Sequence, residues 1–242
     1  MTPISIIIPT LNEQNYLPLL LDSIIEQKYG GKLQIIVVDG DSKDDTVKVA
    51  ESYKERFSDL KVIRTEPNVG SQRNIGVLNS WYERLLFLDA DVILPASCLN
   101  TLAKYSFSDR FIAATFHRSP KMNVLDFLSL VIIYFLFLIA WIARTPVVNG
   151  DFILTSKNLH KSIGGFKEGA ILGEDTDYGV RAVKAGATYK FLFRTHVIAS
   201  DRRLKQMGRI KLISIWSKAF IRARKEKPTY KNIDYPFGHY DD

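Results

Sequence analysis

Two aspartates stand two residues apart at Asp89-Ala-Asp91, directly after the apolar run Leu85–Leu88. Both carboxylates can point at one hard divalent cation. Mg²⁺ held by one or two carboxylates usually completes its coordination shell with substrate phosphate oxygens, and such a cation neutralises the charge that builds on a leaving diphosphate. An Asp-x-Asp pair alone also shapes turns and caps helices, so it predicts a Mg²⁺ or Mn²⁺ site only together with other motifs.

A second acidic cluster follows the apolar run Gln34–Val38. Asp39 ends that run, where its carboxylate can accept hydrogen bonds from the N–H groups of a nucleobase. Asp41 is a further candidate two residues later. Part of this cluster must serve the backbone: we expect Gly40 to allow a tight turn and Ser42 or Asp44 to cap the next helix.

Two more motifs open helices. Gly70-Ser-Gln-Arg-Asn-Ile-Gly76 is a glycine-bounded turn whose amino end can approach a phosphate, with Arg73 placed to reach a phosphate or the carboxylates. It matches neither a Walker A loop nor a dinucleotide fingerprint. Glu174-Asp175 begins a second helix, where acids complement the helix dipole and where a carboxylate can also act as a general base.

The elements that position these residues alternate between strand and helix. Strands are expected at Ile4–Ile8, Gln34–Val38, Leu60–Arg64 and Leu85–Leu88, and helices at Tyr16–Gln27, Asp44–Phe57 and Ser71–Ser80. Continuous apolar strands separated by helices predict an α/β fold with a mostly parallel sheet covered on both faces. Ligands of such sheets bind beyond the carboxyl ends of the strands, which is where the polar clusters stand.

An uncharged run of seventeen residues lies between Asp126 and Arg144, at the lower limit of transmembrane length. One crossing would put Asp89-Ala-Asp91 and Glu174-Asp175 on opposite sides of a membrane. A shared site therefore requires segment 124–144 to be interfacial, re-entrant, part of a hairpin or buried in the core.

The carboxyl-terminal part is basic. Between Arg202 and Lys231 there are eleven Lys or Arg residues and one acid, and the stretch Gly208–Lys227 has an apolar side and a cationic side. Such a stretch favours phosphate-bearing partners: nucleic acid, anionic lipid or a diphosphate. Beside the apolar segment it favours an anionic membrane surface as the partner, and no nucleic acid is expected. The amino terminus has no basic region before its apolar run and Cys98 is the single cysteine, which predicts a cytoplasmic enzyme bound peripherally to the inner face of the plasma membrane.

Taken in order, the motifs resemble family 2 glycosyltransferases with the GT-A fold. They are Pro9-Thr-Leu-Asn-Glu13, Val38-Asp-Gly-Asp-Ser-Lys-Asp-Asp-Thr46, Gly70…Arg73-Asn-Ile-Gly76, Asp89-Ala-Asp91, Gly164-Gly-Phe166 and Glu174-Asp175. The resemblance spans about residues 4 to 204 and implies a Rossmann-like, mostly parallel central sheet flanked by helices. The basic amphipathic stretch after it predicts a membrane-proximal helical part at the carboxyl end.

The resemblance also implies roles for individual residues. Glu13 and Asp39, with Pro9 and Asp41 beside them, would hold the ribose and base of a nucleotide-sugar donor. Arg73 would lie near the diphosphate. Asp89 and Asp91 would be metal ligands, Asp91 the firmer one, and Asp175 the base of an inverting, in-line displacement.

This chain departs from the usual pattern in one place, because Asp-Gly-Asp-Ser replaces the more usual Asp-Asp-Gly-Ser or Asp-Gly-Gly-Ser after the second strand. A third metal ligand is not evident in the motifs; His196 is the candidate. Arg202-Arg203 resembles an arginine pair that some relatives place near the donor phosphates or the acceptor, a task that suits bidentate arginine.

The sequence therefore predicts a metal-dependent inverting glycosyltransferase that uses a UDP- or GDP-sugar, Mn²⁺ or Mg²⁺, and an acceptor at the membrane, such as a polyprenyl phosphate or glycolipid. Residues 1–204, including segment 124–144, would form the catalytic domain and 205–242 a basic amphipathic extension. A sugar-nucleotide nucleotidyltransferase is the enzymatic alternative, although Thr10-Leu-Asn-Glu13 lacks the glycine-rich basic loop expected there. A non-catalytic membrane-surface protein is the other, and the intact acidic motifs argue against it.

Overall fold

The computed structural model describes the chain except residues 107, 119–145, 147, 224, 226 and 228–242. Segment 124–144, the predicted apolar segment, lies outside the described residues, as does the end of the predicted extension. Within the described part, no helix is both long enough and apolar enough to cross a membrane.

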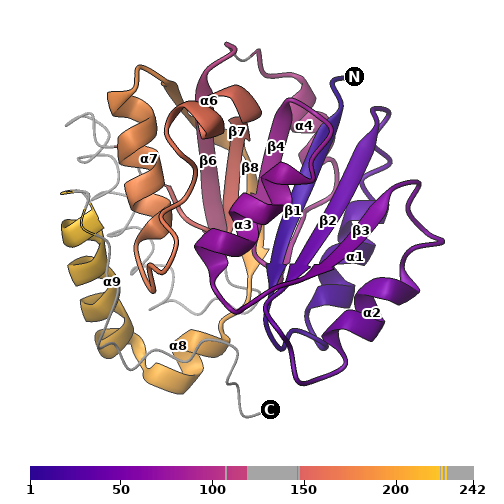
Figure 1. Cartoon of the computed structure of the whole chain (residues 1–242), viewed down its shortest axis with the longest axis horizontal. Coiled ribbons are helices and arrows are strands. Elements are labelled where there is room, and N and C mark those ends of the chain that lie inside the picture. Colours follow the sequence, from indigo (N-terminus) through magenta and orange to yellow (C-terminus); the bar gives the residue numbers. More distant parts are fainter. Residues whose placement is uncertain (107, 119–145, 147, 224, 226, 228–242) are drawn as a thin grey trace.

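A mixed sheet forms the centre of the molecule, with strand order β3-β2-β1-β4-β7-β6-β8-β5 (Figure 1). The strands are β1 (Ile4–Thr10), β2 (Leu33–Asp39), β3 (Leu60–Arg64), β4 (Arg84–Leu88), β5 (Val92–Ile93), β6 (Phe111–Arg118), β7 (Phe152–Ser156) and β8 (Thr188–Ala199). Strands β1 to β4 are mutually parallel where they pair, and β7 is antiparallel to both β4 and β6. The predicted α/β fold with a mostly parallel sheet is confirmed.

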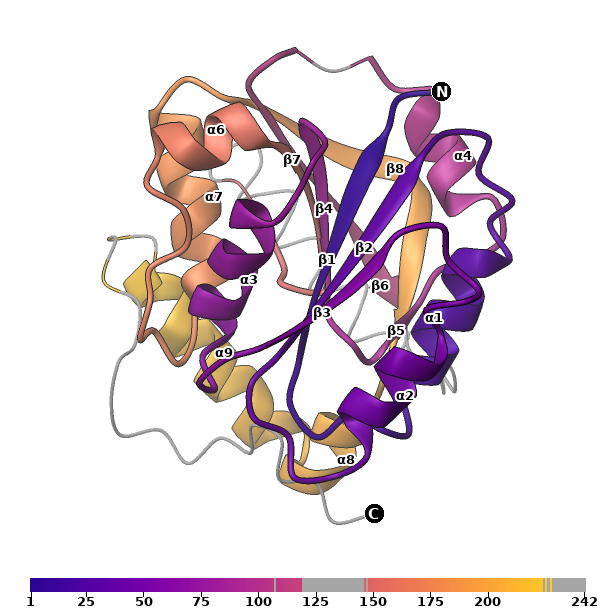
Figure 2. The same ribbon diagram turned by 45° about the vertical axis from the view of Figure 1, so that its right-hand side comes forward.

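Helices cover both faces of this sheet (Figure 2). One face carries α1 (Leu17–Ile25), α2 (Thr46–Ser52) and α4 (Cys98–Ala103); the other carries α3 (Val69–Leu78), α6 (Lys157–Ser162) and α7 (Glu174–Lys184). In β1, Ile4, Ile6 and Ile8 join the core of the first face, and Ile7 joins that of the second. Both faces of a parallel strand are buried, so its sequence is apolar throughout rather than alternating.

Two carboxyl-terminal helices, α8 (Arg202–Met207) and α9 (Arg209–Ala223), run along the lower edge and side of the molecule in Figure 1. Helix α9 packs against α7. Leu212, Ala219 and Ala223 of its apolar side are buried, while Trp216 keeps 40% of its surface exposed. The predicted amphipathic helix is present, and part of its apolar side is already used by the fold.

Two helix starts differ from the sequence-based expectation. Helix α3 begins at Val69 because the Asn68 side chain caps it by accepting the N–H of Ser71 (2.8 Å), so Gly70 and Gly76 lie inside a helix rather than bounding a turn. Helix α2 begins at Thr46. Its N-cap is Asp45, not Ser42 or Asp44, although Asp44 accepts the N–H of Thr46 (3.0 Å) just ahead of the helix.

Gly76 sets the distance between α3 and β1. A Cβ atom there would stand 2.3 Å from Cγ2 of Ile7 in the second core. No side chain makes so close a contact, and Ile7 is fully buried, so α3 could not keep its present distance from the sheet. The glycine therefore brings the helix that carries Arg73 onto the strand that ends at Thr10.

We expect Gly76→Ala to lower the free energy of unfolding by about 1–3 kcal/mol, because overpacking outweighs the better helix propensity of alanine. Urea denaturation measures this. In an Ile7→Ala background the added methyl has room, so the same substitution should cost less. An equal cost in both backgrounds would contradict the packing explanation.

Candidate functional site

The predicted polar clusters meet at one edge of the sheet. Thr10 at the end of β1 pairs in register with Asp39 at the end of β2, and Asp89 directly follows β4, the other neighbour of β1. The amide of Gln72 on α3 donates to the carbonyls of Thr10 (2.9 Å) and Val38 (2.7 Å). It thereby ties the ends of the first two strands together. Nothing in the sequence pattern had singled out Gln72.

Asp39 is buried and already hydrogen-bonded. Its carboxylate accepts the hydroxyl of Thr10 (3.0 Å), the hydroxyl of Ser42 and the N–H of Ser42 (2.9 Å). A carboxylate has about four lone-pair positions, so these three bonds orient Asp39 and leave about one position for a ligand. Asp41 behaves differently: it is exposed, has a positive φ of 62° and pairs with Lys43.

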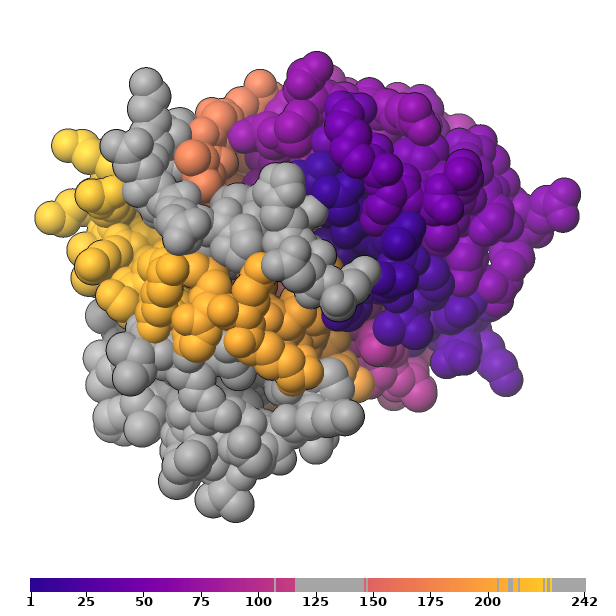
Figure 3. Space-filling model, turned by 90° about the horizontal axis from the view of Figure 1, so that it is seen from below, coloured from indigo at the N-terminus to yellow at the C-terminus, as the bar shows by residue number. Residues whose placement is uncertain are grey.

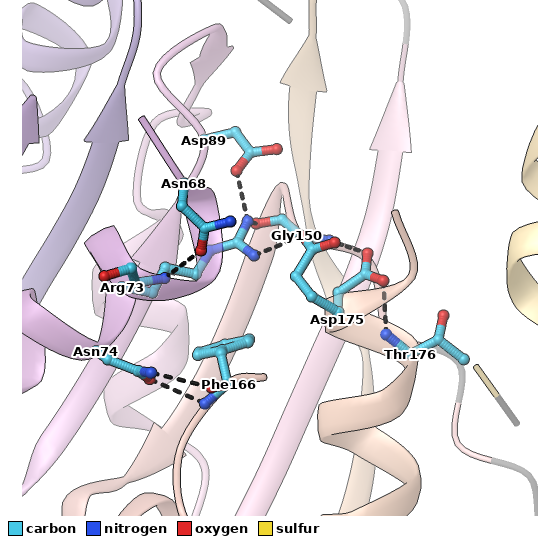
Figure 4. A network of polar contacts seen from close by, with 10 residues as sticks. Asn68, Arg73, Asn74, Asp89, Gly150, Phe166, Asp175 and Thr176 are labelled. Atoms are coloured by element: carbon cyan, nitrogen blue, oxygen red, sulfur yellow. Dashed lines mark hydrogen bonds and ion pairs between the residues drawn. The ribbon is translucent and has the colours of Figure 1, made fainter. Parts of the chain in front are cut away.

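Arg73 lies at the centre of the site and is 1% exposed. One terminal nitrogen donates to Asp89 (2.8 Å) and to the carbonyl of Gly150 (3.2 Å), and the other donates to Glu174 (2.9 Å). Figure 4 shows the guanidinium between Asp89 and Gly150. The predicted arginine is therefore inside the site, but it joins two carboxylates from different motifs rather than facing open space.

Asp175 stands beyond Gly150 in the same view (Figure 4). Its Oδ2 accepts the N–H of Gly150 (2.8 Å) and its Oδ1 accepts the N–H of Thr176. Burial raises the pKa of Asp175, with Arg73 and the two backbone N–H groups opposing that rise. The carboxylate is thus held in a fixed direction, as a positioned proton acceptor requires.

The Gly164-Gly-Phe166 motif fastens this region to α3. Gly164 and Gly165 both have positive φ angles, 74° and 69°, which glycine adopts without strain. Asn74 exchanges two hydrogen bonds of 2.9 Å with the backbone of Phe166, whose ring lies 5.1 Å from the Arg73 guanidinium carbon. The motif therefore holds the Phe166 ring against the Arg73 guanidinium.

A second arginine joins residues from opposite ends of the sequence. Arg202, at the start of α8, pairs with Glu13 and with Oδ2 of Asp91 (3.2 Å), and its guanidinium lies over the ring of Tyr16 (4.4 Å). In Figure 3 the orange surface of this region lies beside the indigo surface of the first residues. Each aspartate of Asp89-Ala-Asp91 thus has an arginine partner, Arg73 for the first and Arg202 for the second.

Glu13 is almost fully buried, and this burial raises its pKa to about 7, against the opposing effect of Arg202. Asp91 adds to the rise and Arg203 opposes it. Because the folded protein holds a proton that the unfolded chain has lost, Glu13 contributes most to stability below its ordinary pKa. That contribution disappears as the pH rises through about 7.

The unfolding free energy of wild type should therefore decrease as the pH rises from about 5 to about 7.5, and in Glu13→Gln this decrease should be smaller. Urea denaturation across that range measures the slope. Glu26→Gln, at an exposed position, is the control and should follow the wild-type curve. A Glu13→Gln curve that runs parallel to wild type would contradict the assignment.

Asp151 is a site residue that the sequence reading missed. Burial raises the pKa of its carboxyl well above the usual value, and Asp89, Asp175 and Asp91 raise it further. The signal that could have found it is Asn149-Gly-Asp151, a polar cluster just before β7. Four aspartates of the described site therefore interact electrostatically at one edge of the sheet.

This gathering of carboxylates, opposed by Arg73, Arg202 and Arg203, is chemically suited to a hard divalent cation, which prefers oxygen ligands. Asp89 and Asp91 are the residues that would hold it. Among the described residues, however, no three His, Cys, Asp or Glu side chains are grouped as a cation site. His196 lies on β8, partly exposed, opposite Phe116 in the strand register.

The remaining predicted residues have definite places. Pro9 is buried within β1, opposite Val38. Arg203 follows Arg202 on α8 and acts electrostatically on both Glu13 and Asp151. Asp91 also lines a small surface pocket together with Tyr16 and Ser200.

Comparison with known proteins gives the same result as the motifs. The model of the family described as Glycosyl transferase family 2 matches residues 5–164. The O-antigen chain rhamnosyltransferase RfbN of Salmonella typhimurium is 30% identical over 196 residues, which cover 76% of this chain and 62% of that protein. The poly(ribitol-phosphate) beta-N-acetylglucosaminyltransferase TarS of Staphylococcus aureus is 31% identical over 109 residues, 43% of this chain and 19% of that protein.

Solved structures share the fold. TarS in complex with UDP-GlcNAc superposes with a TM-score of 0.63 at 22% identity, over 84% of this chain and 59% of that one. The mannosyltransferase PcManGT from Pyrobaculum calidifontis, in complex with GDP-Man and Mn²⁺, gives 0.64 at 22% identity, over 81% and 56%. The chain thus spans about three fifths of RfbN's length and less of TarS's. With the family model matching about two thirds of its residues, this chain belongs to glycosyl transferase family 2.

Proposed function

We propose that the chain is an inverting glycosyltransferase that moves a sugar from a UDP- or GDP-sugar to an acceptor. The observation that carries the proposal is the convergence of four acidic side chains at one sheet edge. Arg202 pairs with Glu13 and Asp91, and Arg73 pairs with Asp89 and with Glu174, the residue before Asp175. Family membership supports it, as do the relatives whose structures hold UDP-GlcNAc or GDP-Man.

In this proposal the nucleoside lies over the ends of β1 and β2. The remaining lone pair of Asp39 accepts a base N–H, which both uracil and guanine offer, and Glu13 lies near the ribose. Arg202 and Arg203 are the cations nearest to the diphosphate. Arg73 stabilises that phosphate environment indirectly, because its own hydrogen bonds go to Asp89, Gly150 and Glu174.

Asp175 is the proposed base. As the acceptor hydroxyl oxygen bonds to the anomeric carbon, the bond from that carbon to the phosphate oxygen breaks, and the nucleoside diphosphate leaves with the bonding electrons. The proton of the hydroxyl passes to Asp175. A cation held by Asp89 and Asp91 would supply Lewis-acid stabilisation of the leaving diphosphate, and the Mn²⁺ in PcManGT supports Mn²⁺ or Mg²⁺ in this role.

Donor binding can be tested with a thermal-shift screen of UDP- and GDP-sugars, with and without Mn²⁺. A ligand that binds only the folded protein at about 100 times its Kd stabilises it by about 2.7 kcal/mol. We expect one nucleotide class to raise Tm, more strongly with Mn²⁺, and Asp91→Ala to remove the Mn²⁺-dependent part. Asp109→Ala, which removes an exposed aspartate ahead of β6, is the control. No shift with any donor under any metal condition would contradict the proposal.

We further propose that the acceptor is lipid-linked, a polyprenyl phosphate or glycolipid, and that the enzyme works peripherally at the inner face of the plasma membrane. Lys211, Lys218 and Arg222 are exposed on α9, and Lys225 is exposed just after its end. On the same helix Ile221 is 58% exposed. Cationic and apolar side chains together favour an anionic membrane interface. Protein that stays in the supernatant with anionic liposomes at low salt would contradict this part alone.

The division into a catalytic domain, residues 1–204, and a basic extension, residues 205–242, remains part of the proposal. The packing of α9 on α7 brings the extension next to the proposed base. Gly173, which precedes α7, lies so close to α9 that an added Cβ would stand 3.0 Å from that of Ala223. The extension can therefore present an acceptor without a long connecting arm.

A further inference from the structure

Arg202 forms an ion pair with Asp91, which is the firmer of the two metal ligands in the proposed function. Its terminal nitrogen contacts Glu13 and lies 3.2 Å from Oδ2 of Asp91. Its guanidinium is stacked on Tyr16 and only about a tenth of its side chain is exposed. Glu13, Asp91 and Tyr16 therefore all help to hold this arginine, and Asp91 among them is the proposed metal ligand.

This contact has a consequence for cation binding. A divalent cation on Asp91 would stand within a few ångströms of the Arg202 guanidinium, and like charges at that distance repel strongly in a partly buried site. The ion pair with Arg202 also neutralises part of the negative charge on Asp91 that would attract a cation. The donor diphosphate removes the conflict, because it brings negative oxygens to which a guanidinium binds well.

We propose that Arg202 is a positioning residue that competes with the divalent cation for Asp91 in the donor-free enzyme and turns to the diphosphate when the donor binds. Cation and donor then bind cooperatively, since each favours the arrangement in which Arg202 has left Asp91. This inference rests on the proposed function. Because Arg202 is the first residue of α8, its movement also links donor binding to the carboxyl-terminal helices.

The test measures Mn²⁺ binding directly, from the electron paramagnetic resonance signal of free Mn²⁺, without and with the nucleoside diphosphate whose sugars raise Tm. That nucleotide is written as UDP below and is GDP if GDP-sugars are the class that binds. In wild type we expect weak binding of Mn²⁺ alone and tight binding with UDP. Arg202→Gln should bind Mn²⁺ alone about 5–20-fold more tightly, a coupling of the usual allosteric size, and UDP should then improve Mn²⁺ binding less than in wild type. Lys205→Gln removes the same charge from the same helix, where Lys205 is exposed and pairs with Asp201, and should match wild type.

Arg202→Gln that binds Mn²⁺ alone within twofold of wild type, or more weakly, would overturn the inference. If that variant does not fold, the wild-type protein still provides a test. The side-chain Nε–Hε resonance of Arg202, assigned by its disappearance in Arg202→Lys, should shift when Mg²⁺ and UDP are added together; an unchanged resonance would overturn the inference.

These outcomes separate the two proposals. Wild-type protein that binds no Mn²⁺ even with UDP would contradict the proposed metal site itself. If wild-type protein binds Mn²⁺ with UDP, and Arg202→Gln binds Mn²⁺ alone no more tightly than wild type does, only the competition between Arg202 and the cation is contradicted.

Discussion

Asp175→Asn is expected to lower kcat by about 10²–10⁴-fold with a hydroxyl acceptor, the usual contribution of a positioned general base. Asparagine keeps the shape of the side chain but cannot take the proton. It also cannot satisfy both backbone N–H donors, Gly150 and Thr176, because only its oxygen accepts. The measurement is the transfer rate at saturating donor, with the unfolding free energy as a check that the variant is folded.

The pH dependence of the same reaction gives a second readout. Burial raises the pKa of Asp175, and a base must be ionised to act, so wild-type kcat should rise with pH through that raised pKa. Asp175→Asn should lose this limb of the profile. Unchanged kcat with a hydroxyl acceptor would contradict the assignment; a small loss with a phosphate acceptor would not, because that oxygen is already ionised near neutral pH.

Arg73→Met is expected to lower the unfolding free energy by about 3–5 kcal/mol, the usual result of removing one partner from a buried ion pair. The substitution leaves Asp89 and Glu174 without the charge that now lies between them. Burial and the neighbouring Asp175 already raise the pKa of Glu174, and Arg73 is the charged group that opposes this rise. Urea denaturation at neutral pH measures the loss.

Two further variants show whether charge is the cause. Arg73→Met/Glu174→Gln removes the unbalanced carboxylate as well and should recover part of the lost stability. Arg56→Met breaks a similar arginine–aspartate pair, with Asp22, that is about half exposed, and should cost much less stability than Arg73→Met because solvent screens an exposed pair. If Arg73→Met costs no more than Arg56→Met, the buried ion pairs do not hold the site together.

Much of the fold could be predicted from apolar patterning alone. The strands Ile4–Thr10 and Leu33–Asp39 are buried on both faces, and such strands are readable as continuous apolar runs. The helix that begins at Glu174 was also predictable, because acids in a first turn are favoured by the helix dipole. The convergence of polar clusters followed from the topology of parallel sheets.

Long-range pairing could not be predicted in the same way. Nothing in the sequence says that Arg202 reaches Glu13, 189 residues away, or that Arg73 turns inward to two carboxylates rather than outward to a phosphate. Those choices depend on how α3, α7 and α8 meet, which is set by close packing. Asp151 went unrecognised for a related reason: its importance lies in its neighbours, Asp89, Asp91 and Asp175, and not in its own sequence motif.

The most direct test of the central claim is hydrolysis or transfer of a UDP- or GDP-sugar by the purified chain, followed by release of the nucleoside diphosphate with and without Mn²⁺. The account predicts Mn²⁺-stimulated release in wild type and in Asp109→Ala, and loss of the Mn²⁺-stimulated part in Asp91→Ala. Release that is the same in Asp91→Ala as in wild type, or no release from any nucleotide sugar that binds, would contradict it.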